Sequence, residues 1–251
     1  MTVYFIGAGP GAADLITVRG QRLIQRCEVC LYAGSIMPED LLALCPTDAR
    51  VVDTGPLDLE QIIAEITAAH AEGRDVARLH SGDPSLYSAV AEQSRRLEEL
   101  GIDYEIVPGV PAYAAAAAAL GRELTVPGVA QTVTLTRVST LSTAMPEGED
   151  LATLAAPGAT LVIHLAAHRI DAIVPQLLAG GYTEDSPVAV VAFASWPQQV
   201  VLRGTLADIA GQMHDAEITR TAVMIVGDVL AAEGFPDSYL YSAGRTRRDR
   251  H

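Results

Sequence analysis

The chain has 251 residues, which allows one large domain or two small ones, and 49% of them are hydrophobic, so we expect a folded protein with a sizeable core. Its 31 acidic and 17 basic residues give a formal net charge of −14, which argues against a nucleic-acid-binding protein, because such proteins usually carry a basic surface. An anionic small substrate remains possible if arginines or backbone N–H groups form a local site for it.

No segment predicts secretion or membrane insertion. The chain begins without the basic stretch of a signal sequence, and its longest apolar stretch, residues 110–120, is too short to span a bilayer. The three cysteines are an odd number, which favours reduced thiols. Cys27 and Cys30 have the spacing of a metal or redox pair, but they lie in an apolar segment without a second pair, which favours a buried structural role. We therefore expect a cytoplasmic protein.

Short β-branched runs alternate along the chain with helical patterns, which predicts an α/β fold. The expected strands are residues 3–6, 29–33, 76–79, 104–107, 132–136, 160–165, 188–193, 199–202 and 221–226. The expected helices are residues 18–26, 39–44, 59–72, 87–100, 111–120, 169–179 and 206–214.

The two halves of the chain differ in the order of these elements. Up to about residue 110, strands and helices alternate, as in a parallel sheet with crossover helices. After Thr132 the strands cluster, and a hairpin around Trp196 and Pro197 predicts a second, mixed sheet. We expect an N-terminal α/β domain over residues 1–112, a C-terminal α/β domain over 113–243 and a disordered tail over 244–251, which lacks an apolar pattern.

A glycine-rich loop follows the first expected strand. In VYFIGAGPGAADLITVRG, Gly7, Gly9 and Ala12 satisfy the relaxed G-x-G-x-x-G/A pattern of dinucleotide-binding proteins. Pro10 removes one N–H donor from this loop, and the second strand ends at YAGS without the carboxylate that binds a ribose. An NAD-dependent oxidoreductase is therefore a disfavoured alternative, and a tight turn that approaches a small ligand is favoured.

Four later segments carry further signals: RLHSGDPSLY (78–87), YEIVPGVPAYAAAAAAL (104–120), ATLVIHL (159–165) and PVAVVAFASWPQQVVLRGTL (187–206). Each one alone is explained better by ordinary packing than by a functional role. Asp83, for example, could simply cap a helix that begins near Pro84.

In this order and spacing, the segments together resemble the tetrapyrrole (corrin and uroporphyrinogen) methyltransferases that use S-adenosylmethionine. The resemblance rests on GAGPG, GDPS, VPGV and AVMIVGDVL, and it covers nearly the whole chain. Within that family, YAGS, ELTVPGVAQTVTLTR, MPEGEDL and ASWPQQVVLRGTL are similar to the members that methylate carbon C-11 of precorrin-4, giving precorrin-5 in cobalamin biosynthesis. Cobalt-precorrin-4, the substrate of the anaerobic route, is an alternative, and a non-catalytic tetrapyrrole carrier is another.

The resemblance implies two α/β domains of the tetrapyrrole methylase fold rather than the Rossmann fold, with the cofactor in the cleft between them. It also implies a homodimer and S-adenosyl-L-homocysteine as the second product. Carried over onto this sequence, the cofactor site should include Pro10, Ser81, Gly82, Asp83, Leu86, Pro111, Ala112, Leu165, Ala194, Thr221 and Ala222.

The sequence also departs from its relatives. Ala33 stands where uroporphyrinogen methyltransferases have an aspartate proposed as a base, and Thr54 stands near the place of a lysine in those enzymes. This chain should therefore not methylate uroporphyrinogen by that route. In residues 138–146, VSTLSTAMP replaces a segment that usually reads GRTP, so one arginine of the substrate trough is missing.

Three side chains are candidates for contact with the tetrapyrrole. His80 directly precedes the GDPS segment and titrates near neutrality, so it could act as a general base, although a hydrogen-bonded histidine at a strand end is an equally good interpretation. Arg78 and Arg137 could bind the acetate and propionate groups, because arginine favours bidentate contacts with carboxylates. We expect no protein-bound metal, since any metal would belong to the substrate.

Overall fold

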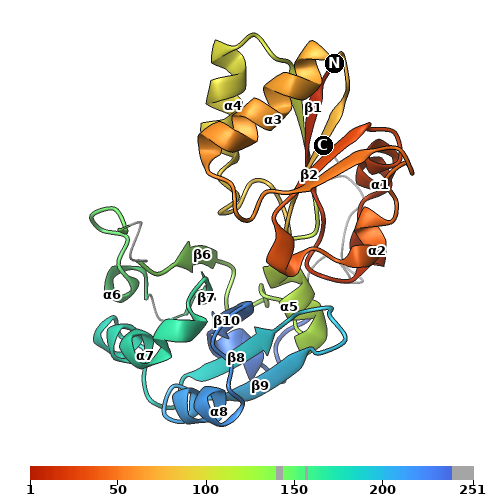
Figure 1. Cartoon of the computed structure of the whole chain (residues 1–251). Coiled ribbons are helices and arrows are strands. Elements are labelled where there is room, and N and C mark those ends of the chain that lie inside the picture. Colours follow the sequence, from red (N-terminus) through yellow and green to blue (C-terminus); the bar gives the residue numbers. More distant parts are fainter. Residues whose placement is uncertain (140–143, 156–157, 239–251) are drawn as a thin grey trace, which may run out of the picture. The chain divides into compact units, whose positions relative to one another are not determined.

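The structure, a computed structural model, describes residues 1–139, 144–155 and 158–238, and their contacts form two compact units (Figure 1). The first unit is Met1–Ala115 together with Ala194–Gln198, and the second is Ala116–Phe193 with the chain from Gln199 onward. The sequence places the boundary between residues 112 and 113 and does not foresee the short piece added to the first unit. The tail expected over residues 244–251 lies outside the described residues.

The first unit contains a five-stranded sheet in the order β3-β2-β4-β1-β5. Every neighbouring pair in it is parallel, which confirms the predicted sheet type. The strands are β1 (Val3–Gly7), β2 (Val29–Tyr32), β3 (Arg50–Asp53), β4 (Val76–His80) and β5 (Tyr104–Val107). Strand β3 was not predicted, because it is a short edge strand with charged ends and mostly exposed side chains.

Helices cover both faces of this sheet, as a parallel sheet requires. Figure 1 shows α1 (Val18–Ile24) and α2 (Glu39–Leu42) on one side of it and α3 (Leu59–Ala71) and α4 (Val90–Glu99) on the other. Successive residues of β1 point to opposite faces of the sheet. Phe5 belongs to the core under α3 and α4, with Ile66 and Leu97, whereas Ile6 belongs to the core under α1 and α2. Helix α5 (Ala112–Leu120) contains the point at which the contacts divide the chain.

The second unit contains a mixed sheet in the order β6-β7-β10-β8-β9, as predicted. Strands β6 and β7 are parallel, and the other pairs are antiparallel, including the predicted β8–β9 hairpin. The strands are β6 (Val133–Arg137), β7 (Thr160–His164), β8 (Pro187–Ala192), β9 (Val200–Thr205) and β10 (Ala222–Val226). Ile163 and Val190 share a core with Ile173 of α7 (Ile170–Ala179) and Met213 of α8 (Ile209–Asp215).

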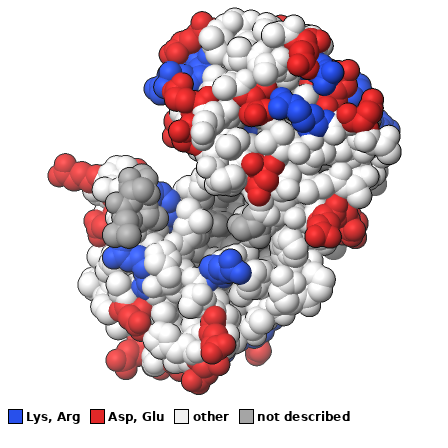
Figure 2. Space-filling view, viewed as in Figure 1, with Lys and Arg blue, Asp and Glu red and all other residues white. Residues whose placement is uncertain are grey.

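Short elements escaped the sequence analysis because they are too short to show a period. These are α6 (Leu151–Leu154) and the 3-10 turns η1 (Ala13–Leu15), η2 (Gly34–Ile36), η3 (Ala167–Arg169) and η4 (Asp228–Leu230). None of the described helices has the length and apolar character that crossing a membrane requires. On the face shown in Figure 2, the described basic side chains form small groups among acidic ones rather than one continuous patch.

Candidate functional site

Three loops meet at the carboxyl edge of the first sheet. Strand β1 lies between β4 and β5, so the loops that follow these strands emerge side by side, where parallel sheets usually bind ligands. Gly9 and Gly82 join two of the loops by exchanging backbone hydrogen bonds of 3.2 and 2.7 Å. Both residues have positive φ angles, +81° and +70°, which glycine adopts without strain.

The same loops approach each other too closely for side chains. A Cβ added to Gly7 would lie 2.5 Å from the Cα of Gly109, and one added to Gly109 would lie 2.2 Å from the carbonyl oxygen of Gly82. Glycine is therefore required at Gly7 and Gly109 so that backbone can pack directly on backbone. We call residues 7–12, 81–86 and 109–112 together the rim.

Asp83 links two loops of the rim. Its Oδ2 accepts a hydrogen bond of 2.8 Å from the N–H of Gly109, and its Oδ1 accepts one of 2.8 Å from the N–H of Ser85 and a further one from the Ser85 hydroxyl. Burial raises the pKa of Asp83, but these hydrogen bonds outweigh it and the net pKa is lowered. The alternative in which Asp83 caps a helix that begins near Pro84 is wrong, because α4 begins only at Val90.

The structure brings together all seven cofactor residues predicted in the rim. A Cβ on Gly82 would lie 3.7 Å from both the Cα of Pro111 and the amide nitrogen of Ala112. Pro10 and Gly82 are buried, Ser81 is exposed, and the other four, Asp83, Leu86, Pro111 and Ala112, are half-buried. The rim therefore offers backbone groups and small, partly accessible side chains, which suit a ligand held without a charged cluster.

Three of the predicted residues, Leu165, Thr221 and Ala222, lie at one end of the sheet of the second unit, whereas Ala194, expected in the second domain, belongs to the first unit. Met224 of β10 pairs with Ile163 of β7, and the same register, continued, brings Ala222 level with Leu165. The N–H of Phe193, which precedes Ala194, donates a 2.8 Å hydrogen bond to the carbonyl of Thr221. Leu165 is 54% exposed, an unusual state for a leucine beside a buried strand. Leu165 and Thr221 also have φ angles of +55° and +52°, and such strained backbone is typical of functional sites.

His80 is buried behind the rim at the end of β4. Burial and the positive charge of Arg78 lower the pKa of His80 to about 3. Its ring lies 5.7 Å from that of Phe5, and its Nε2 has no hydrogen-bond partner among the described residues. A group with so low a pKa removes protons poorly at neutral pH, so its role as a base stays a prediction with weak chemical support.

Arg78 is a buried cation inside the first unit. Its Nε donates to the side-chain oxygen of Gln93 over 3.1 Å, and its Nη1 donates to the hydroxyl of Thr54 over 2.9 Å. Burial lowers the pKa of Arg78 to about 10, so the guanidinium stays charged at neutral pH. Its predicted contact with a substrate carboxylate stays a prediction. Such a contact would have to use the guanidinium N–H groups that do not bind Gln93 or Thr54.

Arg137 lies at the end of β6. It donates hydrogen bonds of 3.1 and 3.3 Å to the carbonyl groups of Val138 and Ala144. Both acceptors belong to the atypical segment 138–146, of which residues 140–143 lie outside the described part of the chain. Arg137 therefore shapes this segment, and its predicted contact with the substrate stays a prediction.

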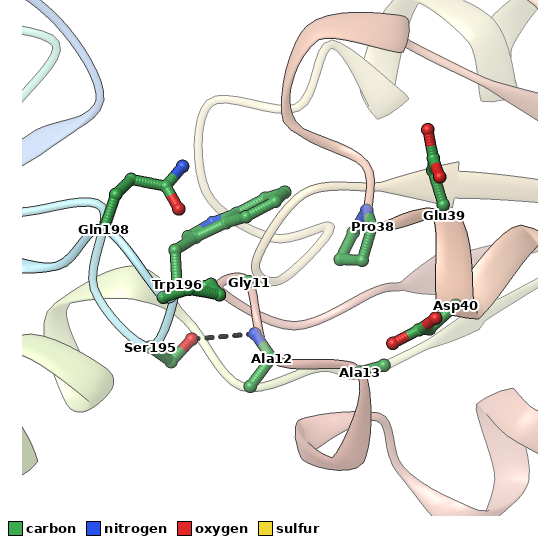
Figure 3. A pocket seen from close by; sticks show the side chains of 10 residues that line it. Gly11, Ala12, Ala13, Pro38, Glu39, Asp40, Ser195, Trp196 and Gln198 are labelled. Carbon is green, nitrogen blue, oxygen red and sulfur yellow. Dashed lines mark hydrogen bonds between the residues drawn. The ribbon is translucent and has the colours of Figure 1, made fainter.

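Ser195 and Trp196 contact the glycine-rich loop, a contact that the sequence does not predict. They lie in the turn between β8 and β9, and Figure 3 shows Trp196 beside Gly11 and the hydrogen bond between Ser195 and Ala12. The Trp196 indole N–H donates to the carbonyl of Pro10 over 3.0 Å, and the Ala12 N–H donates to Ser195 Oγ over 2.9 Å. The ASWPQQ string marks the turn, but no local pattern reveals a contact between residues 186 positions apart.

This turn, residues 11–13 of the glycine-rich loop and residues 38–40 at the start of α2 line a cavity of about 620 Å³ (Figure 3). The indole and the loop give it apolar and backbone walls, and two carboxylates on α2 give it a negative side that disfavours an anion. The lining residues are Gly11, Ala12, Ala13, Pro38, Glu39, Asp40, Ser195, Trp196, Pro197 and Gln198.

The described residues contain no group of three or more His, Cys, Asp or Glu side chains placed to hold a metal ion. Cys27 and Cys30 are buried free thiols, and burial raises the pKa of Cys27 to about 12. These cysteines pack in the core between the sheet and the layer of α1 and α2, which fits the structural role expected for them.

Comparisons with known proteins agree with this architecture. Residues 2–210 match the family model of the tetrapyrrole (corrin/porphyrin) methylases. The chain is 78% identical, over 99% of both chains, to a precorrin-4 C(11)-methyltransferase of Mycobacterium tuberculosis. A solved cobalt-precorrin-4 methyltransferase of cobalamin biosynthesis matches with a TM-score of 0.88 and 39% identity, covering 91% of this chain and 95% of its own.

A uroporphyrin-III C-methyltransferase from Thermus thermophilus, solved with S-adenyl homocysteine, matches with a TM-score of 0.77 and 29% identity over 92% of this chain and 93% of its own. The likeness thus extends over both units and to a structure that holds the demethylated cofactor. The chain therefore belongs to the tetrapyrrole (corrin/porphyrin) methylase family and is an S-adenosylmethionine-dependent methyltransferase.

Proposed function

We propose that this enzyme transfers the methyl group of S-adenosylmethionine to carbon C-11 of precorrin-4, giving precorrin-5. The observation that carries the proposal is the 78% identity, over 99% of both chains, to a precorrin-4 C(11)-methyltransferase. A lower identity of 39% links the chain to a cobalt-precorrin-4 methyltransferase, so metal-free precorrin-4 is the favoured substrate and its cobalt complex the second candidate.

The rim suits the methyl donor. S-adenosylmethionine, when bound, supplies an electrophilic methyl group on a cationic sulfur for in-line transfer to a carbon nucleophile. Ser81, Pro111 and Ala112 present small, partly accessible side chains at the edge where the three loops meet. The glycine contacts and the Asp83 hydrogen bonds fix these loops, and a fixed binding surface lowers the entropic cost of aligning two reactants.

The main task of the protein is positioning rather than proton transfer. The conjugated macrocycle itself makes its ring carbon electron-rich, so the nucleophile needs little activation by the chain. The pKa of His80, lowered to about 3 by burial and by Arg78, agrees with a site in which no strong base acts at this position. Ala33 and Thr54, which stand in place of the aspartate and lysine of uroporphyrinogen methyltransferases, fit the same account.

The substrate carboxylates need local cations on a chain of net charge −14. Arg78 is a buried, charged side chain that donates a hydrogen bond to the hydroxyl of Thr54. Arg137 donates a hydrogen bond to the carbonyl of Val138, in the segment after β6. We propose that Arg78 supplies positive potential near the ends of β2 and β3 and that Arg137 shapes the trough. Glu39 and Asp40 on the cavity wall would repel the substrate carboxylates, so we place the substrate carboxylates outside this cavity.

We further propose that the enzyme acts as a homodimer in the cytosol and binds no nucleic acid. Its free thiols suit a reducing compartment. Its excess of acidic residues, with basic groups scattered on the visible face in Figure 2, suits a partner other than nucleic acid.

A methylation assay tests the proposal directly. Labelled S-adenosylmethionine is supplied with precorrin-4, cobalt-precorrin-4 or uroporphyrinogen III, and label in the tetrapyrrole is measured. We expect the highest kcat/KM for precorrin-4, a lower value for the cobalt complex and no transfer to uroporphyrinogen III. Preference for the cobalt complex would establish the second candidate, and transfer to uroporphyrinogen alone would contradict both.

A further inference from the structure

The turn Ala194–Gln198 connects two strands of the second unit, yet its contacts belong to the first unit. Its backbone is held in an uncommon shape. Phe193 and Ser195 have φ angles of +50° and +68°, in the left-handed region that residues other than glycine rarely adopt. Such conformations persist only where surrounding contacts hold them. Phe193 is held by its hydrogen bond to the carbonyl of Thr221, and Ser195 and Trp196 are held by hydrogen bonds to the glycine-rich loop.

Three interactions attach the turn to the loop. The Trp196 indole N–H donates to the carbonyl of Pro10 over 3.0 Å, and Ser195 Oγ accepts from the N–H of Ala12 over 2.9 Å. Between these two bonds, the indole lies against Gly11, where an added Cβ would fall 2.2 Å from Trp196 Cδ1 (Figure 3). Gly11 is thus needed for the close contact with the ring, although its φ is not in the left-handed region.

The loop is held from its other side as well. Gly9 exchanges two backbone hydrogen bonds with Gly82, so residues 9–12 are bonded to Gly82 at one end and to Ser195 and Trp196 at the other. Pro10 has no N–H, and its carbonyl is its only hydrogen-bonding group. Trp196 binds that group.

We propose that Ser195 and Trp196 form a latch that holds residues 9–12 in the shape that binds the methyl donor, which makes them positioning residues for the cofactor. The inference rests on the proposed function, because it assumes that the rim is the cofactor site. A loop that is already fixed loses less conformational entropy on binding, so the latch increases affinity without touching the reacting atoms.

Two variants weaken the latch at different points. Trp196→Phe keeps an aromatic ring but loses the N–H donor, and Ser195→Ala removes the acceptor for Ala12. We expect each to raise the dissociation constant for S-adenosylhomocysteine and the KM for S-adenosylmethionine by about two- to tenfold, the range of one net hydrogen bond. The kcat at saturating substrates should stay within about twofold, because the latch acts on binding.

A third variant and a matched control separate the latch from general stability. Gly11→Ala forces the indole away from the loop and should weaken binding at least as much as Trp196→Phe. Gly211→Ala, in α8, adds the same methyl group where nothing lies within 4 Å, so it should keep the wild-type affinity. A purely structural role would lower the unfolding midpoint of the latch variants and leave their affinity for the cofactor product unchanged.

The chain contains a single tryptophan, so its indole signals report on the latch alone. We expect saturating S-adenosylhomocysteine to shift the one indole N–H resonance and the fluorescence maximum of the wild-type protein. Ser195→Ala keeps Trp196 and provides this readout even if Trp196→Phe does not fold. Wild-type affinity in Ser195→Ala and Gly11→Ala, with no shift of the indole signals, would overturn the latch alone. Absence of S-adenosylhomocysteine binding by the wild type would overturn the proposed function and the latch with it.

Discussion

At the scale of single residues, the pKa values of buried His80 and half-buried His164 make stability depend on pH. Burial and Arg78 lower the pKa of His80 to about 3, and burial lowers that of His164 to about 4. An unfolded histidine takes up its proton near pH 6.5. Between these values the unfolded state binds more protons than the folded state, so stability falls as the pH falls.

Each histidine should therefore cost about 2 kcal/mol of unfolding free energy when the pH is lowered from 7 to 5. Urea unfolding of wild type and His80→Gln at both pH values checks this, with His70→Gln, at an exposed position, as the control. The loss on acidification should be about 2 kcal/mol smaller in His80→Gln than in the other two proteins. An identical loss in all three would mean that His80 keeps a pKa near its ordinary value in the folded state, which would restore it as a candidate base.

At the scale of elements, the sequence located the strands well and the contacts between loops poorly. Apolar runs and Pro-Gly turns are local signals, so β1, β4 and β5 and the loops after them were predicted nearly at their observed bounds. Asp83 followed by Pro84 has the pattern of a helix start, but the partners of Asp83 are Ser85 and Gly109. Gly109 is 26 residues away, and no periodicity encodes such a pairing.

Because Asp83 joins the loops after β4 and β5, its loss should affect both stability and binding. Asp83→Ala leaves the N–H groups of Ser85 and Gly109 without their acceptor, and we expect a loss of about 1–3 kcal/mol in unfolding free energy. We also expect a weaker affinity for S-adenosylhomocysteine, measured by calorimetry on the same preparation, because the rim loses its fixed shape.

Asp150→Ala is the matched control for this substitution. Asp150 also accepts hydrogen bonds from a backbone N–H and a hydroxyl, both of Thr153, but it caps α6 in the second unit. Its removal should lower the stability only slightly, as for an exposed helix cap, and leave cofactor affinity unchanged. If Asp83→Ala behaves in the same way as Asp150→Ala, the rim is not the cofactor site.

At the scale of the whole molecule, the fold class, two sheets and chemistry could be predicted because they depend on element order and on long motifs. What could not be predicted depends on contacts between distant parts of the chain. Trp196 binds the carbonyl of Pro10, and Thr54 and Gln93 bind Arg78 inside the first unit. The sequence shows the charge of Arg78, which makes it a candidate partner for substrate carboxylates, but it does not show that the side chain is buried.

The pattern of the glycine-rich loop, taken alone, would also fit a nicotinamide oxidoreductase, so one titration tests the methyltransferase account directly against it. The purified chain is titrated in a calorimeter with S-adenosylhomocysteine and, separately, with NAD. Our account predicts a micromolar dissociation constant for S-adenosylhomocysteine, which corresponds to a binding free energy of about −8 kcal/mol. It predicts no heat of binding with NAD. Binding of NAD without binding of S-adenosylhomocysteine would contradict it.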